Sequence, residues 1–143
     1  MKYRDLGKTG ITTSLLSLGT GGARQFGQTQ GYSINQQKRL IGRALELGIN
    51  MIDSSSNYSN SEELLGKSLA GIPRDNYYIC TKWPARDDSG ATVTNPDKLV
   101  EAIDASLRRL NVDHLDVMML HGVLPSEYDL IVNKLAEPLI NAK

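Results

Sequence analysis

Four polar side chains in the sequence are of the kinds that transfer protons in enzyme active sites. They are Asp53, Tyr58, Lys82 and His121. A carboxylate, a phenol, an ammonium and an imidazole can together donate protons, accept them and stabilise charge on an oxygen atom. Taken singly, each residue also has an ordinary structural interpretation, as a turn residue, a packing residue or a solvated polar group. Whether they form a site therefore depends on the elements that position them.

The segment 48–69 shows how the chain presents two of these side chains. Its first residues, Ile49 to Ile52, are typical of a short buried strand, and Asp53 stands at the carboxyl end. A serine-rich loop leads to Tyr58, and Ser59-x-x-Glu62 predicts a capping box at the start of a helix. In α/β folds the carboxyl end of a strand is where ligands bind, so an acid and a phenol beside this loop are candidates for chemistry.

The remaining strands and their connections repeat this plan. The chain opens with an expected hairpin of Tyr3–Leu6 and Ile11–Ser14 around a glycine-containing turn. Short apolar runs predict four further strands, at Leu15–Leu18, Ile49–Asp53, Tyr77–Lys82 and Leu115–Leu120. The strand ends fall near Gly19, Asp53, Lys82 and His121. The intervals between these ends, 34, 29 and 39 residues, each fit one strand and one crossover helix.

Helix signals occupy the intervals between the expected strands. Ser33-x-x-Gln36 predicts a capped helix, whose buried stripe we expect to be Leu40, Ile41, Ala44 and Leu45. A second helix is expected near Ser61–Ala70. Asn95 with Pro96 predicts the start of a third, with one apolar face at Leu99, Ile103, Leu107 and Leu110. A fourth begins at Pro125-Ser126 and runs towards Ala136, and Pro138 should kink or break it.

Repeated β/α units with right-handed crossovers make the strands parallel. Their carboxyl ends then share one edge, so Asp53, Tyr58, Lys82 and His121 should converge. The architecture is either a small open sheet or part of a (β/α)8 barrel, and the opening hairpin suits a plug at the amino-terminal end of a barrel. The sequence does not fit a Rossmann fold, because Arg24 stands where the G-x-G-x-x-G motif requires its third glycine. We therefore expect an α/β fold of the (β/α)8 TIM-barrel type, with about four units after the hairpin.

Length, composition and charge exclude several classes of protein. The 143 residues favour a single domain over residues 1–143, and 16 basic residues balance 16 acidic ones, so neither nucleic acid nor an anionic membrane is expected as a partner. No apolar signal region follows Met1, and no run is long enough to span a membrane, so a cytoplasmic protein is expected. With Cys80 as the single cysteine and two histidines, no metal site is expected.

Several motifs taken together resemble the aldo-keto reductase family. They are Leu6-Gly7-Lys8-Thr9-Gly10, Ser17-Leu18-Gly19-Thr20, Gly48 to Asp53 with Tyr58, Ser61 to Gly66, Thr81-Lys82 and Leu120-His121-Gly122. The resemblance is collinear from Lys2 to about Lys143. It implies the amino-terminal half of the family's barrel, either a truncated record or a true short protein. The chain departs from the family pattern at Ser55, where alanine is usual, and at Ser59, where glycine commonly follows the tyrosine.

The resemblance also implies an activity and a division of labour among the four side chains. The family transfers hydride from NADPH to an aldehyde or ketone, or runs the reverse reaction on an alcohol. Tyr58 would be the general acid, Lys82 would stabilise its phenolate, and Asp53 would hold Lys82 charged and in place. His121 would hydrogen-bond the substrate carbonyl.

The same resemblance implies cofactor contacts at Thr20, Gly21 and Asp53, with NADP(H) rather than NAD by family habit alone. Trp83 could line a substrate pocket or cover the rim of the barrel. The alternative to an enzyme is a catalytically inactive family member, acting as a regulatory subunit or an assembly module. A half-barrel would expose the edges of its first and fourth strands, so self-association is also expected.

Overall fold

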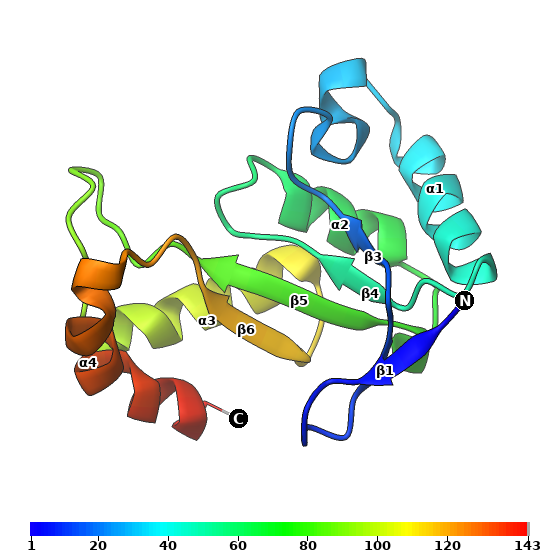
Figure 1. The fold of residues 1–143 in the computed structure, drawn as a ribbon. Helices are drawn as coiled ribbons and strands as arrows, with labels where there is room; N and C mark the ends of the chain where they lie inside the picture. Colours follow the sequence, from blue (N-terminus) through cyan, green and yellow to red (C-terminus); the bar gives the residue numbers. More distant parts are fainter. Residues whose placement is uncertain (143) are drawn as a thin grey trace.

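A computed structural model describes residues 1–142 (Figure 1). The strands, in chain order, are β1 (Tyr3–Asp5), β2 (Thr12–Ser14), β3 (Ser17–Gly19), β4 (Met51–Asp53), β5 (Tyr78–Trp83) and β6 (Val117–Leu120). The helices are α1 (Ile34–Glu46), α2 (Ser61–Leu69), α3 (Pro96–Leu110) and α4 (Tyr128–Asn141), with 3-10 turns η1 (Gln25–Gln30), η2 (Arg74–Asn76) and η3 (Pro125–Glu127). None of these helices has both the length and the apolar character that a membrane span requires.

The two sheets confirm the expected topology. β1 and β2 form the antiparallel hairpin, and β3, β4, β5 and β6 form one parallel sheet in that order. Asn50, just before β4, accepts from the backbone N–H of Ser14 at 2.7 Å, and Tyr3 Oη donates to the carbonyl of Gly48 at 2.9 Å. The hairpin is therefore fastened to the amino-terminal end of the parallel sheet.

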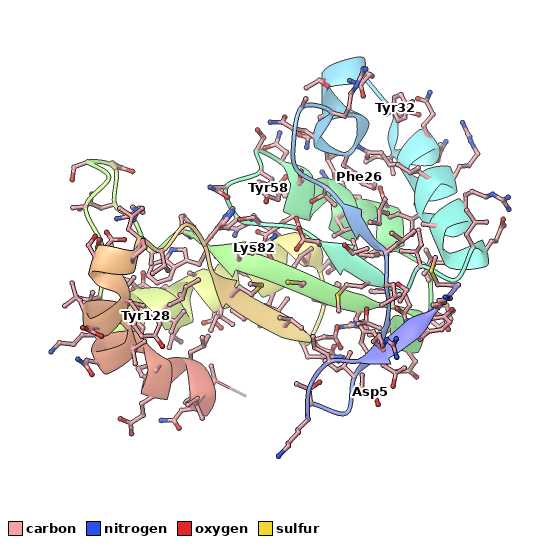
Figure 2. The ribbon with its side chains drawn as sticks, viewed as in Figure 1. Asp5, Phe26, Tyr32, Tyr58, Lys82 and Tyr128 are labelled. Carbon is pink, nitrogen blue, oxygen red and sulfur yellow. The ribbon has the colours of Figure 1, made fainter. Side chains whose placement is uncertain are left out.

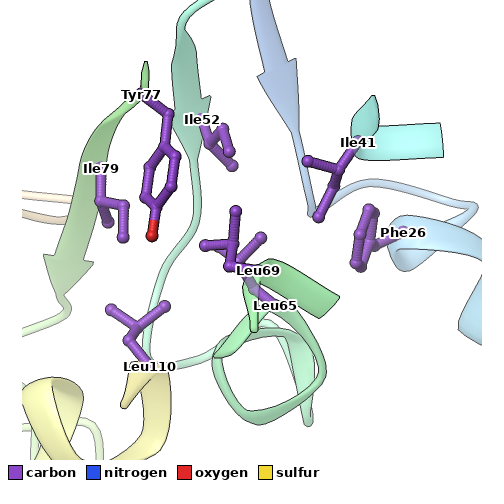
Figure 3. Packing of buried hydrophobic residues seen from close by; sticks show 8 residues of the cluster. All are labelled: Phe26, Ile41, Ile52, Leu65, Leu69, Tyr77, Ile79 and Leu110. Carbon is purple, nitrogen blue, oxygen red and sulfur yellow. The ribbon is translucent and has the colours of Figure 1, made fainter. Parts of the chain in front are cut away.

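One face of the parallel sheet carries the helices, and both apolar clusters of the molecule lie on it (Figure 1). In register, Leu18, Ile52 and Ile79 point to this face. Figure 3 shows the first cluster, which joins the sheet to α1, α2 and the end of α3, and its buried members are Phe26, Ile41, Ile52, Leu65, Leu69, Tyr77, Ile79 and Leu110. The second cluster packs α4 on α3 around Leu99, Ile131 and Leu135.

Among residues 1–142, no helix lies over the opposite face of the sheet (Figure 1). Alternation along the strands places Asp53, Cys80, Lys82 and Met119 on this face. Met119 is 46% exposed, although it lies on a strand. The fold is thus four consecutive β/α units of the (β/α)8 barrel type, with the concave side of the sheet open.

Three local predictions about the chain between β2 and α2 are wrong. The strand expected at Leu15–Leu18 begins only at Ser17, because Ser14 Oγ donates to the carbonyl of Leu16 and turns the chain there. The buried stripe of α1 does not include Leu40, which is 39% exposed. Gln37 is buried instead, and its amide donates to the carbonyl of Phe26 at 3.0 Å. The capping box at Ser33 and Gln36 is confirmed.

The third wrong prediction concerns the capping box of α2, at Ser59 and Glu62. Ser59 has φ 49°, in the left-handed region, whereas a capping residue needs an extended backbone. The helix itself begins at Ser61, as expected, and among the described residues no side chain caps it. Glu62 is only 2% exposed and accepts from Arg109 Nε and Thr81 Oγ1, both at 2.6 Å. Glu62, which was expected to take part in capping α2, therefore joins α2 to α3 and β5.

Pro138 does not end the last helix at the expected position, because α4 continues to Asn141. A proline inside a helix removes one backbone hydrogen bond. Leu135 and Leu139, on either side of Pro138, both pack on the second apolar cluster. This anchoring holds the last turn in place.

Candidate active site

Asp53 and Lys82 form an ion pair at the carboxyl edge of neighbouring strands. Lys82 Nζ lies 2.7 Å from Asp53 Oδ1 and 2.7 Å from the carbonyl oxygen of Ser54. The lysine side chain is only 12% exposed. These two contacts fix the position of the ammonium group at the edge of the sheet.

Tyr58 lies in the loop after β4 and turns its ring towards that ammonium, as Figure 2 shows at the tip of β5. Lys82 Nζ is 5.1 Å from the centroid of the Tyr58 ring. The ring also packs on the backbone of Gly21, where an added Cβ would lie 2.5 Å from Tyr58 Cε2. Glycine at position 21 therefore makes room for the phenol.

His121 follows β6 directly, and its backbone N–H donates to the carbonyl of Trp83 at 2.8 Å. Its ring meets that of Tyr58 edge to face, with centroids 5.7 Å apart and planes at 83°. The structure thus brings Asp53, Tyr58, Lys82 and His121 to one edge of the sheet. Proton donors of three kinds and one carboxylate share this edge, which is an arrangement suited to acid–base chemistry on a ligand oxygen.

Thr20 and Gly21, expected to touch a cofactor, lie beside this group. The backbone N–H of Thr20 donates to the carbonyl of Asp53 at 2.9 Å, which extends the pairing of β3 with β4. Its side chain is fully buried and donates to Ser54 Oγ at 2.9 Å. The hydroxyl of Thr20 is therefore engaged inside the protein, and cofactor contact at Thr20, Gly21 and Asp53 stays a prediction.

Two residues of the loop between β4 and α2 belong to the site, although we did not predict them. Ser55 Oγ is 3.0 Å from His121 Nδ1, and Asn57 Oδ1 is 3.2 Å from the same nitrogen. Serine and asparagine are common in loops, so their types and spacing carry no signal. Only the departure from alanine at Ser55 pointed to anything unusual here.

Trp83 belongs to the helix-covered side of the sheet. It pairs with Leu120 in register, and both pack against the second apolar cluster. This packing differs from both interpretations left open for Trp83, which were the lining of a substrate pocket and a cover over the rim of the barrel.

An ion pair between Arg86 and Glu127 connects the loops on either side of β6, close to His121. Glu127 accepts from both terminal nitrogens of Arg86, at 2.5 and 2.7 Å, and also from Thr92 Oγ1 and the backbone N–H of Leu124. Arg86 in addition donates to the carbonyl of Gly122 at 3.3 Å. These bonds join the loop after β5 to the loop after β6. The Arg86 guanidinium, followed by the Thr92 hydroxyl, lowers the pKa of Glu127 to about 2.

Cys80 is a buried residue of β5. It is 7% exposed, and burial, followed by the negative charge of Asp53, raises the pKa of its thiol to about 11. A thiol held in its protonated form is a poor nucleophile. Cys80 is therefore no candidate for covalent chemistry.

Comparison with known proteins identifies a family and several similar proteins. The model described as the aldo/keto reductase family matches residues 17–140. A Schizosaccharomyces pombe protein, named provisionally as a voltage-gated potassium channel subunit beta, is 35% identical over 133 residues, which cover 87% of this chain and 37% of that protein. The NADH-specific methylglyoxal reductase of Escherichia coli is 32% identical over 137 residues, covering 85% of this chain and 42% of the enzyme.

The similarity extends to solved structures. An aldo-keto reductase from Bacillus halodurans, in its holo form, superposes with a TM-score of 0.78 at 28% identity. The match covers 99% of this chain and 46% of that one. The chain thus spans about two fifths of the length of the curated relatives described above.

Proposed function

Because the chain belongs to the aldo/keto reductase family, we propose that it carries the proton-transfer residues of an NADP(H)-dependent reductase of aldehyde and ketone carbonyls. The same site would serve the reverse reaction, the oxidation of an alcohol. The observation that supports this most is the spatial arrangement of Asp53, Lys82 and Tyr58. The ion pair with Asp53 holds Lys82 Nζ 5.1 Å from the centroid of the Tyr58 ring.

The role proposed for each of the four side chains follows from this spatial arrangement. A carbonyl that gains a hydride becomes an alkoxide, which needs a proton, and Tyr58 would donate it. The ammonium of Lys82 stabilises the phenolate left behind, and Asp53 keeps the ammonium charged. His121, with its ring against that of Tyr58, would orient the substrate oxygen.

A bound nicotinamide cofactor would supply the hydride to the carbonyl carbon. The residues present are compatible with such a ring. Gly19 is exposed and carries no side chain, and the Asp53 side chain is 31% exposed, so a flat group has access to this edge of the sheet. NADPH is proposed as the donor, and because one relative is named as NADH-specific, both cofactors belong in the assay.

The test measures oxidation of NADPH and of NADH with para-nitrobenzaldehyde. We expect little turnover from the 143-residue chain alone, because its open sheet face leaves water at the reacting atoms. The chain joined to the carboxyl-terminal β/α units of the Bacillus halodurans reductase should be active. Tyr58→Phe should then lower kcat by about 100-fold or more, which is the usual contribution of a general acid.

Tyr128→Phe is the matched control, because Tyr128 is 61% exposed on α4 and outside the site. A chimera that is folded, by circular dichroism and cooperative melting, yet inactive with both cofactors would refute the proposal. If the 143-residue chain alone turns over substrate, and Tyr58→Phe abolishes that turnover, the proposed function is supported. The same result would refute the expectation that activity requires the carboxyl-terminal β/α units.

A second candidate function is a catalytically inactive regulatory or assembly module. The relative named provisionally as a channel subunit favours it, because family membership there accompanies a subunit name rather than an enzyme name. A folded chimera that binds NADPH but gives no turnover with aldehydes, ketones or alcohols would support this candidate over the first.

A further inference from the structure

The Nδ1 nitrogen of His121 faces a polar cluster to which the proposed reaction assigns no role. It lies 3.0 Å from Ser55 Oγ and 3.2 Å from Asn57 Oδ1. Ser55 is completely buried, so this side of the ring is closed to ligands. Within residues 1–142 the other ring nitrogen, Nε2, makes no hydrogen bond to the protein. It is the nitrogen left for a ligand.

The third contact of this cluster shows where its protons lie. Ser55 Oγ is 2.6 Å from Asn57 Oδ1, which is usual for O–H···O and short for N–H···O. The Asn57 amide therefore presents its oxygen. Ser55 donates its single proton to that oxygen or to the carbonyl of Lys82, which lies 3.2 Å from Ser55 Oγ. Once this proton is engaged, Ser55 Oγ and Asn57 Oδ1 can only accept hydrogen bonds from the histidine ring.

We infer that Ser55 and Asn57 hold His121 as the Nδ1–H tautomer. A neutral imidazole carries one proton, and the hydrogen bond at one nitrogen decides the state of the other. The neutral ring therefore offers the lone pair of Nε2 to a ligand as an acceptor. Ser55 and Asn57 act through His121, so they are positioning residues rather than catalytic ones.

This tautomer specifies which ligand the neutral ring fits, a step that rests on the proposed function. A carbonyl oxygen has no proton, so it cannot donate to Nε2. The hydroxyl of an alcohol can donate there. Of the two forms of the substrate, the alcohol is thus the one that neutral His121 binds, so the orienting role proposed for His121 applies to the alcohol oxygen. Tyr58 alone provides a neutral donor for a carbonyl.

Nitrogen NMR on the isotope-labelled 143-residue chain tests the tautomer without any turnover. The chain has two histidines, so the spectrum can be assigned. With the rings neutral, we expect Nδ1 of His121 to show the chemical shift and proton coupling of a protonated nitrogen, and Nε2 those of a bare one. A proton found on Nε2 would overturn the inference.

Variants separate positioning from general structural effects. Replacing both partners, with Ser55→Ala and Asn57→Ala, should release Nδ1 and give a mixture of tautomers, whereas Asn57→Asp, which keeps an acceptor, should retain Nδ1–H. Ser56→Ala is the matched serine control, and His114 is the internal reference because its Nδ1 bonds Asp113. An unchanged His121 spectrum in the double variant would contradict the positioning role, and the proposed reductase function would still stand.

Discussion

The ring of Tyr58 occupies the space that any side chain at position 21 would need. A Cβ on Gly21 would approach three ring atoms of Tyr58 within 2.8 Å, closer than real Cβ contacts come. This contact and the ammonium of Lys82 together set the direction of the phenol. The site thus depends on a residue with no chemistry of its own.

Gly21→Ala should therefore displace the Tyr58 ring from its present position beside Lys82. We expect altered ring resonances of Tyr58 in the variant, measured by NMR on tyrosine-labelled chain. Gly19→Ala is the control, because its Cβ would meet nothing within 4 Å and its φ is not positive. Identical Tyr58 resonances in the two variants would show that the contact does not set the ring.

Between elements, the packing of α2 on α3 depends on another glycine. A Cβ at Gly66 would lie 2.5 Å from the carbonyl oxygen of Leu110 and 2.7 Å from that of Arg109. Both atoms are backbone, so the helices would have to separate. The adjacent ion pair of Glu62 with Arg109 and the hydrogen bond from Thr81 fix the same spacing.

Gly66→Ala should lower the free energy of unfolding, although alanine is the better helix former by about 1 kcal/mol. Overpacking costs about 1–3 kcal/mol, so we expect a net loss of about 0–2 kcal/mol. The matched control is Gly42→Ala in α1, where a Cβ meets nothing within 4 Å, and it should raise stability by up to about 1 kcal/mol. Urea unfolding measures both, and a stabilised Gly66→Ala would contradict the prediction.

The ion pair between the last two loops predicts a dependence of stability on pH. The pKa of Glu127 is lowered from 4.5 to about 2 by Arg86 and Thr92, so the folded state favours the carboxylate. Its stabilising contribution is complete above pH 4.5 and is lost as the pH falls towards 2. Glu127→Gln should therefore reduce the fall of the melting temperature across this pH window.

Thermal unfolding followed by circular dichroism at several pH values measures this effect. Glu137→Gln is the control, because it removes an exposed carboxylate of α4 that has no hydrogen-bond partner within residues 1–142. Equal pH profiles for the two variants would rule out the loop ion pair as the source of the dependence.

The four-stranded parallel sheet has an unpaired strand at each edge. β3 and β6 are its outer strands, and apolar side chains lie exposed near both, at Leu15 and Leu16 beside β3 and at Met119 on β6. Unpaired edge strands with apolar neighbours promote association. We therefore expect the 143-residue chain to self-associate, measured as mass by light scattering after size exclusion.

Met119→Lys, which places a charge on the edge strand, should shift the chain towards monomer. Leu6→Lys, in the hairpin, is the control for the change in net charge. A monomeric mass for the unmodified chain, together with cooperative thermal unfolding, would contradict the expected association.

The order of strands and the site at their carboxyl ends could be predicted because both follow from local patterns. Apolar runs mark the four strands, the capping residues Ser33 and Asn95 mark two helices, and parallel pairing then obliges Asp53, Lys82 and His121 to share an edge. The boundaries were less predictable. Ser59 satisfies the capping pattern, yet its backbone takes a conformation that cannot cap.

What the sequence determined is thus the repeating plan and the identity of the four reactive side chains, because hydrophobic periodicity and residue type are properties of the chain itself. The burial of Glu62, the fit of Tyr58 against Gly21 and the hydrogen bonds of Ser55 and Asn57 to His121 were decided by folding. Each joins segments that are distant in the chain, or depends on the direction of a side chain. Contacts of that kind exist only once the elements have packed.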